Sequence, residues 1–407
     1  MPRLLASLVC CLVLASRIAS AAEPLAALKP KLQEYVDKGQ VAGVVAVVGR
    51  RDKVLATEVV GSQDIESKSP MRADTLFRIA SMTKPITAIG IMILADEGKL
   101  SVDDPVEKHL PEFKGQRIVT EKSGDTLTLK MPSRPITLRD LLTHTSGLPG
   151  APPAGLADLY PKRNRTLAEG TLVYSQQPLE FEPGSKWAYC NTGIDTLGRV
   201  IEVVSGKSYE DFLRDRVFIP LEMKDSTFYP SSEQLARLAQ TYDQKDGKLI
   251  PTPHSLVGTP VGAKYPIPAG GLYSTAGDLA KLYQTMLARG MRGEKRTLSD
   301  DSIEKRILSE ASVEAMTRLQ TGDLACGFVP GMGFGYGWAV VKEPQGVTAM
   351  LSPGTYGHGG AFGTQGWIDP KQDLFVILLI QRMGLPNADG SDLRRDLQTI
   401  AVSAVKE

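Results

Sequence analysis

The stretch SMTKPITAIGIMILADE, residues 81–97, carries more information about the fold than any other part of the sequence. Almost every residue after Pro85 is apolar on all sides of a helical projection, which predicts a buried helix from Met82 to Glu97. Pro85 falls in the first turn, where its missing N–H costs little because that group has no intrahelical partner anyway. Ser81 and Lys84 are three residues apart, so they are neighbours on one face of that turn.

Ser81 and Lys84 are candidates for nucleophilic chemistry. Burial lowers the pKa of an ammonium, so Lys84 can accept or relay the Ser81 proton. The helix N-terminus also presents N–H groups and a positive dipole end to a developing oxyanion. The alternative is a serine N-cap beside a solvated lysine, which is what most isolated Ser-x-x-Lys patterns are. A solvated lysine does not explain an ammonium on a helix that is expected to be buried. The chemical interpretation of Ser81 and Lys84 is therefore favoured.

A second candidate is Tyr189-Cys190-Asn191, which follows Pro183-Gly184. A tyrosine near an ammonium loses its proton more easily and can serve as a general base. The Asn191 amide can hydrogen-bond both a lysine and a substrate carbonyl. Aromatic-x-amide triplets are common in loops, so this motif gains its weight only beside the others.

The third candidate is the segment YGHGGAFG, residues 356–363, which leads into a predicted strand. Its four glycines in eight residues are typical of backbone that approaches a ligand closely. Taken alone, the segment is equally well interpreted as a flexible turn.

In this order, the three motifs resemble those of the serine β-lactamase and penicillin-binding-protein superfamily. Within it, the chain resembles the class C β-lactamase-related serine hydrolases, which include esterases and D-stereospecific peptidases. Further segments match that family, namely residues 141–148 (LLTHTSGL), Pro183-Gly184 and residues 270–275 (GGLYST). The resemblance covers the chain from about Leu25 to Gln381.

The resemblance implies roles for individual residues. Ser81 would be the nucleophile, Lys84 its proton partner, and Tyr189 the general base and leaving-group acid. Asn191 would orient the substrate. Which of Lys84 and Tyr189 holds the working proton is left open, and His144 in LLTHTSGL is expected to be structural.

The glycine-rich motif would contribute backbone. His358-Gly359-Gly360 would form the edge strand beside the scissile bond, and the backbone N–H groups of Ser81 and Ala361 would form the oxyanion hole. Members that recognise penicillins usually carry Lys-Thr-Gly there, and its ammonium and hydroxyl meet the substrate carboxylate. His358 replaces that fixed charge with a group near its pKa at neutral pH, and the hydroxyl is lost. Weaker carboxylate binding is therefore expected, which favours neutral esters or amides.

The two ends of the chain are predicted to form one antiparallel sheet flanked by helices, in an α+β, β-lactamase/transpeptidase-like fold. The sheet part would comprise about residues 22–105 and 290–407, with a mostly helical insert at about 106–289. The predicted strands are residues 41–48, 54–60, 334–341, 363–368 and 373–381, and the predicted helices are 25–38, 138–144, 191–204, 209–217, 275–287 and 391–405. The long loops 148–162 and 250–271 are expected to border a site.

Residues 1–21 have the pattern of a secretory signal peptide. Arg3 precedes a twelve-residue apolar stretch too short to cross a bilayer, and Ala19-Ser20-Ala21 offers a cleavage site. An exported protein, periplasmic or secreted and without a membrane span after cleavage, is expected. An uncleaved anchor is the alternative, because Arg17 lies unusually close to the cleavage site.

The composition of the chain argues against some classes of partner and cofactor. The chain of 407 residues has 47 basic and 46 acidic side chains, interspersed, which argues against nucleic acid as the main partner. Four scattered histidines and no Cys-x-x-Cys pair give no reason to expect a metal, and no cofactor is implied. Cys190 and Cys326 remain after cleavage and are expected to be free thiols. Oligomeric state is left open.

The leading hypothesis is a serine hydrolase that forms an acyl-enzyme on Ser81, with a small ester or amide as substrate and an ester preferred. A β-lactam or a D-amino peptide is the close alternative, since either uses the same machinery. A penicillin-binding-type receptor with slow turnover is a hypothesis of another class. A structural protein with three incidental motifs is the remaining one.

Overall fold

One eight-stranded sheet joins the two ends of the chain. The computed structural model describes residues 24–252, 262–291, 306–385 and 388–406. The strand order is β10-β11-β12-β13-β14-β1-β2-β3, and all neighbouring strands are antiparallel. These strands are β1 Gly43–Gly49, β2 Val54–Asp64, β3 Ser69–Pro70, β10 Met332–Phe334, β11 Ala339–Val341, β12 Tyr356–Gly359, β13 Gln365–Asp369 and β14 Leu374–Leu379. The predicted sheet from both chain ends is confirmed.

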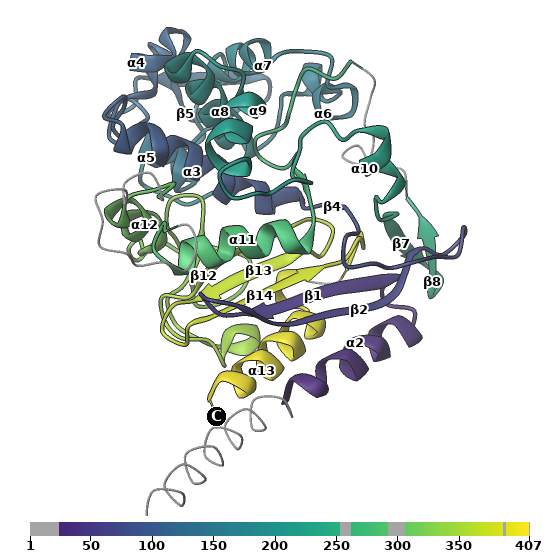
Figure 1. Cartoon of the computed structure of the whole chain (residues 1–407). Coiled ribbons are helices and arrows are strands. Elements are labelled where there is room, and N and C mark those ends of the chain that lie inside the picture. Colours follow the sequence, from purple (N-terminus) through teal and green to yellow (C-terminus); the bar gives the residue numbers. More distant parts are fainter. Residues whose placement is uncertain (1–23, 253–261, 292–305, 386–387, 407) are drawn as a thin grey trace, which may run out of the picture.

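Strand β1 shows why the sheet has helices on both sides. Every residue of β1 is buried, and its side chains alternate between two cores. Val45 and Val47 face the larger core, whereas Val44 and Val48 face the smaller one. Figure 1 shows α11 (Ala276–Leu287) over one face of the sheet and α2 (Leu28–Asp37) with α13 (Asp392–Lys406) under the other. Although α11 falls within the 106–289 segment expected to form the insert, its contacts with β14 and β1 place it with the sheet.

The other half of the molecule is mostly helical and is built around α3 (Thr83–Asp96). Every residue of α3 from Thr83 to Leu94 is buried, as its sequence predicted, and α3 packs against α8 (Asn191–Ser205). The remaining helices are α4 Val106–His109, α5 Leu138–Leu142, α6 Leu159–Lys162, α7 Leu167–Ser175, α9 Tyr209–Leu213, α10 Ser232–Ala236 and α12 Glu310–Thr317. The predicted helix 209–217 changes after α9 into a π-helical turn, Arg214–Phe218.

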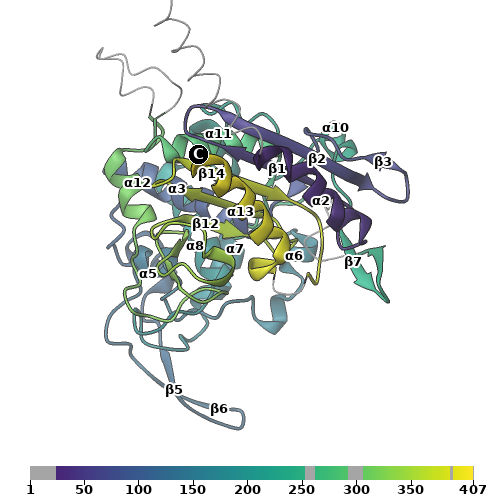
Figure 2. The same cartoon turned by 90° about the horizontal axis from the view of Figure 1, so that it is seen from below.

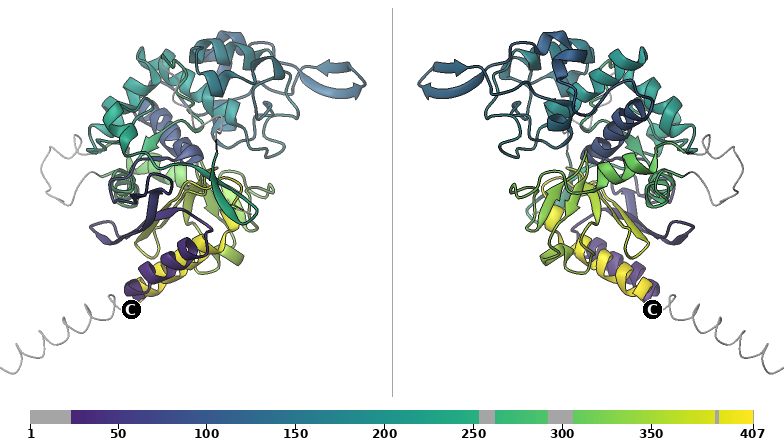
Figure 3. Two further views of the ribbon diagram at one scale, coloured as in Figure 1. Left: turned by 90° about the vertical axis from the view of Figure 1, so that its right-hand side faces the viewer. Right: turned by 90° about the vertical axis from the view of Figure 1, so that its left-hand side faces the viewer.

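The described residues also contain three short pairs of strands. They are β4 Phe77–Arg78 with β9 Tyr273–Ser274, β5 Ile118–Ser123 with β6 Thr126–Lys130, and β7 Tyr242–Lys245 with β8 Lys248–Pro251. The β5–β6 hairpin projects away from the helical half (Figure 2), and the side views show how far it stands clear of the other elements (Figure 3). The predicted loop 148–162 contains α6. Part of the predicted loop 250–271, and all of the predicted signal peptide, lie outside the described residues.

The single predicted strand 334–341 is wrong, because the segment forms two strands joined by a tight turn. Gly335 N–H donates to the Trp338 carbonyl at 2.8 Å and closes the turn. Gly337 has a φ of 72°, and a Cβ atom there would lie 2.6 Å from the Cβ of Ala88 on α3. The turn therefore needs glycine in order to pack against the helix that follows Ser81.

Candidate active site

Ser81 lies in a short 3-10 turn, Ala80–Met82, immediately before α3. Ala80 has a φ of 47°, a strained conformation for a residue with a side chain. The Thr83 hydroxyl donates to the Ala80 carbonyl at 2.7 Å and stabilises this turn. The Ser81 side chain is partly exposed, whereas the residues on either side of it are buried.

Lys84 is completely buried, and its ammonium nitrogen has three oxygen partners. Nζ lies 3.2 Å from Ser81 Oγ, 2.8 Å from Asn191 Oδ1 and 2.7 Å from the Ala269 carbonyl oxygen. Burial lowers the pKa of Lys84 to about 7, and the Asp195 carboxylate opposes that decrease. A substantial fraction of Lys84 is therefore an uncharged amine at neutral pH.

The two shorter contacts fix the direction of the amine lone pair. The Ala269 carbonyl oxygen and the Asn191 amide oxygen both accept hydrogen bonds and cannot donate them. An uncharged Lys84 has two N–H groups, which these two acceptors engage. Its lone pair is then directed at the Ser81 hydroxyl, which is the arrangement that a general base requires.

Tyr189 lies beside the same ammonium but contacts it with its ring. Lys84 Nζ is 4.6 Å from the centre of the Tyr189 ring, a cation–π geometry. Burial raises the pKa of Tyr189, and a hydrogen bond with Ser81 only partly opposes this increase. The expectation that the lysine would ease proton loss from Tyr189 is corrected, because burial dominates. At neutral pH the tyrosine is a phenol, able to donate a proton.

His358 lies on β12, and its ring is 6.0 Å from that of Tyr189. Its Nδ1 is 2.6 Å from the Gly359 carbonyl oxygen, which only accepts, so Nδ1 carries the proton. Burial, reinforced by the charge of Lys84, lowers the pKa of His358 to about 3. The expectation of a ring near its pKa at neutral pH is therefore wrong: His358 is uncharged.

The glycines beside His358 are required by packing. A Cβ atom on Gly359 would lie 2.2 Å from Asp389 Oδ1, and one on Gly360 would lie 2.5 Å from the Ile79 carbonyl oxygen. The end of β12 thus lies directly against the chain that leads into Ser81. Strand β12 lies between β11 and β13, but β11 pairs only with Tyr356 and Gly357. His358 and Gly359 pair with β13 alone, so the part of β12 nearest Ser81 has an open edge, as expected.

The expected oxyanion hole has one clearly available donor. Ala361 is exposed and follows β12 directly. Within the described part of the chain, its backbone N–H donates no hydrogen bond. Such a donor is available to a substrate oxygen.

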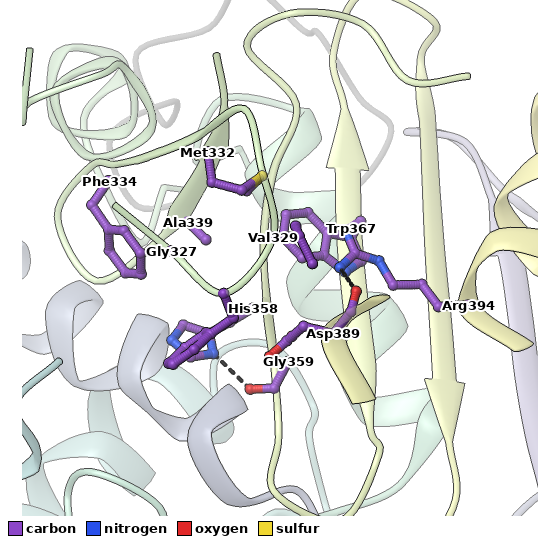
Figure 4. Close-up of a pocket in the computed structure, with 11 residues that line it drawn as sticks. Gly327, Val329, Met332, Phe334, Ala339, His358, Gly359, Trp367, Asp389 and Arg394 are labelled. Carbon is purple, nitrogen blue, oxygen red and sulfur yellow. Dashed lines mark hydrogen bonds between the residues drawn. The ribbon is translucent and has the colours of Figure 1, made fainter. Parts of the chain in front are cut away.

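A pocket lies at the end of β12, between His358 and the segment that carries Asp389 (Figure 4). Its volume is about 310 Å³, including space open to solvent. Most of the side chains around it are apolar or aromatic. The apolar and aromatic residues that line the pocket are Phe328, Val329, Met332, Phe334, Ala339 and Trp367. His358, Asp389 and Arg394 also line it, together with Gly327 and Gly359.

The aromatic residues of the site were not predicted from the sequence. The Phe328 side chain is 52% exposed, and its ring lies 5.0 Å from Tyr189 and 6.0 Å from Trp187. Trp187 stands two residues before Tyr189, a signal that could have been noticed. The position of Phe328 depends on tertiary structure and has no local signal.

His144 has the contacts of a structural residue. It is completely buried, its Nδ1 accepts a hydrogen bond from the Cys190 N–H at 3.1 Å, and its ring packs 4.7 Å from that of Tyr189. These contacts hold the Tyr189 segment in place. Cys190 and Cys326 are both free, as expected.

The structure thus brings together Ser81, Lys84, Tyr189, Asn191 and His358, which come from three distant parts of the sequence. It adds one partner that was not predicted, the carbonyl of Ala269. Every residue type has this group, so no side-chain pattern could have indicated it. The local signal is only the neighbouring Gly270-Gly271, where a Cβ on Gly271 would lie 1.8 Å from the Pro266 carbonyl oxygen.

Comparison with known proteins identifies the family and the fold. The beta-lactamase family model matches residues 28–401. Esterase EstB of Burkholderia gladioli is 32% identical over 387 residues, which cover 88% of this chain and 91% of EstB. Lovastatin esterase of Penicillium rubens is 28% identical, covering 90% of this chain and 94% of that enzyme. The solved structure of EstCE1, a hydrolase with promiscuous acyltransferase activity, superimposes with a TM-score of 0.76 at 27% identity, covering 96% of this chain and 99% of EstCE1.

The chain belongs to the beta-lactamase family, with the β-lactamase/transpeptidase-like fold. It is a serine hydrolase of that family, and its esterase relatives favour esterase over β-lactamase activity. Among the described residues, no helix is both long enough and apolar enough to cross a bilayer.

The buried, uncharged state of His358 gives a test by NMR. We expect the ring of His358 to show no change of protonation between pH 8 and pH 5, because its pKa of about 3 lies below that range. Ring chemical shifts would be followed in protein labelled at histidine and assigned with His358→Asn. A titration of His358 with a midpoint between pH 6 and 7 would contradict the geometry.

Proposed function

We propose that the chain is a carboxylic-ester hydrolase that works through an acyl-enzyme on Ser81. The contacts of Lys84 support this most directly. Two acceptors engage its N–H groups, which directs the amine lone pair at the Ser81 hydroxyl. In this proposal Lys84, and not Tyr189, is the general base for acylation.

The reaction proceeds in two halves. Ser81 Oγ bonds to the ester carbonyl carbon while its proton moves to Lys84, and the backbone N–H groups of Ser81 and Ala361 stabilise the oxyanion. The C–O bond to the alcohol then breaks, and the leaving oxygen takes the proton held by Lys84, either directly or through the Tyr189 phenol, which Lys84 then reprotonates. Water next attacks the acyl-enzyme by the same route, releasing the acid and restoring Ser81. Asn191 holds Lys84 in place and has an amide N–H available to the substrate.

The environment of His358 favours a neutral ester over a β-lactam. The uncharged His358 provides no cation for a carboxylate, and Gly359 has no hydroxyl and no room for one. The close alternative is a β-lactamase or a D-amino peptidase or carboxypeptidase. A receptor that is acylated with slow turnover remains the second candidate class, because it would use the same nucleophile.

Hydrolysis assays separate these possibilities. A short-chain p-nitrophenyl ester and a chromogenic cephalosporin would be compared on the same protein, with Ser81→Ala as control. We expect sustained ester turnover with little cephalosporin hydrolysis, and a loss of at least about a thousandfold in kcat in Ser81→Ala. Faster turnover of the cephalosporin would indicate a β-lactamase. A single stoichiometric burst, with the acyl group found on Ser81 by mass spectrometry, would indicate a receptor.

The pH dependence tests the role of Lys84. Protonated Lys84 cannot accept the Ser81 proton, so kcat/KM for the ester should decrease as the pH falls through about 7 and level off above it. Lys84→Met should abolish turnover while leaving the folded state intact. An acidic limb with a midpoint near pH 4 would assign the base to a carboxylate and contradict the proposal.

We also propose that the protein is exported, on the basis of residues 1–21. Expression of the full chain in a Gram-negative host should yield a protein in the periplasm or medium whose mass lacks residues 1–21 or 1–22. Intact mass spectrometry of each cell fraction measures this. An intact N-terminus in the membrane fraction would support the uncleaved anchor, and an intact N-terminus in the cytoplasm would contradict export.

A further inference from the structure

Asp195 is a completely buried carboxylate behind the catalytic lysine. It lies on α8 four residues after Asn191, so both side chains lie on the same face of that helix. In the described residues, no lysine, arginine or histidine forms an ion pair with Asp195. A buried carboxylate is costly, so its partners indicate what it does.

Three donors hold the Asp195 carboxylate. The Tyr160 hydroxyl donates to Oδ2 at 2.7 Å, and the Tyr265 hydroxyl donates to the same atom at 2.8 Å. The Ala269 backbone N–H donates to Oδ1 at 2.9 Å. The tyrosines come from separate segments, so the carboxylate joins α8, α6 and the chain before Gly270.

Ala269 connects this carboxylate to Lys84. Its N–H is bound by Asp195, and its carbonyl accepts from Lys84 Nζ at 2.7 Å. The preceding residues form a tight turn, in which Ile267 has a φ of 58°. A strained turn keeps its shape only when its surroundings hold it, and the Asp195 hydrogen bond is one such restraint.

Of the titratable groups that face Asp195, only Lys84 changes its charge near neutral pH. Tyr265 before the turn, Tyr174 on α7 and Tyr209 on α9 are buried, and Tyr160 on α6 is partly buried. The pKa of each is raised. Cys190 at the start of α8 is likewise buried with a raised pKa. These groups are uncharged at neutral pH. Burial raises the pKa of Asp195 to about 6, and its hydrogen bonds and the Lys84 ammonium oppose this increase. The Asp195 carboxylate in turn favours the Lys84 ammonium.

We propose that Asp195 is a positioning residue for the general base, which holds the Ala269 carbonyl against Lys84 and supplies a negative charge that favours its ammonium. The proposal rests on Lys84 being the base of the proposed function. In the catalytic cycle, this charge stabilises Lys84 in the step in which it has taken the Ser81 proton. It acts through Lys84 and the Ala269 turn and does not contact substrate.

Asp195→Asn is the main test. The amide keeps nearly the same shape but removes the charge, so the Lys84 ammonium becomes less favourable. The acidic limb of kcat/KM should then move to lower pH by roughly half a unit to one unit, and the plateau rate should fall about tenfold or more. A merely structural role would lower the plateau and leave the limb where it is.

The controls separate this proposal from the proposed function. Asp278→Asn is the control, since Asp278 is a buried carboxylate on α11 outside the site. Its partners are the Asp225 N–H, the Ser226 hydroxyl and, at 3.6 Å, the Lys281 ammonium. We expect Asp278→Asn to leave the limb unmoved. The rate at which a p-nitrophenyl phosphonate modifies Ser81, releasing p-nitrophenolate as the P–O bond forms, gives the same limb without ester turnover.

The outcomes are distinct. If the wild-type enzyme has no limb near pH 7, the role of Lys84 fails. If that limb exists and Asp195→Asn leaves it unmoved, only the Asp195 proposal is overturned. Should Asp195→Asn fail to fold by circular dichroism, the variant Tyr160→Phe/Tyr265→Phe takes its place. Removing two donors favours the protonated Asp195, so the limb should again move to lower pH, and an unmoved limb overturns the proposal.

Discussion

The Lys84 ammonium stands on a helix that is otherwise apolar and buried, and much of the structure around the site accommodates it. An amine in such a place needs hydrogen-bond acceptors, and they come from Asn191 at the start of α8 and from the Ala269 carbonyl. The third nearby oxygen is the Ser81 hydroxyl. The hydrogen bonds that satisfy the buried amine therefore also place the proposed base beside the proposed nucleophile.

The sheet holds the same turn from the opposite side. The Thr364 hydroxyl donates to the Ile79 carbonyl at 3.2 Å, and Gly360 packs against that same carbonyl. The backbone N–H of Ala361 is brought to the site in this way, opposite the N-terminus of α3. Pairing with β13 continues through Gly359, which fixes this end of β12 beside the Ile79 carbonyl. The proposed oxyanion donors therefore come from two neighbouring turns, one before α3 and one after β12.

The parts of this arrangement that could be predicted are those with a periodic or compositional signal. The continuous apolar run predicted α3, and the β-branched runs near both termini predicted the sheet. The prediction of one strand at residues 334–341 was wrong, because two glycines turn the chain where its apolar residues indicate a strand. The Ala269 carbonyl and the buried Asp195 could not be assigned, since a backbone group has no sequence signature and a single aspartate within a helix indicates nothing by itself. The predicted protonation state of His358 was wrong, because the pKa of this ring depends on burial by residues distant in the sequence.

The correction at His358 strengthens the argument about substrate. A charged histidine would have offered a carboxylate a charge-assisted hydrogen bond, worth about 1.5–3 kcal/mol, or roughly a ten- to hundredfold preference. An uncharged ring whose Nδ1–H is already bound to Gly359 offers none of this. The adjoining pocket also contains both the Asp389 carboxylate and the Arg394 guanidinium, which stacks 3.9 Å from the centre of the Trp367 ring and has a pKa lowered to about 9 by burial. These charges offset each other beside an aromatic wall, which supports the proposed preference for a neutral ester over an anionic substrate.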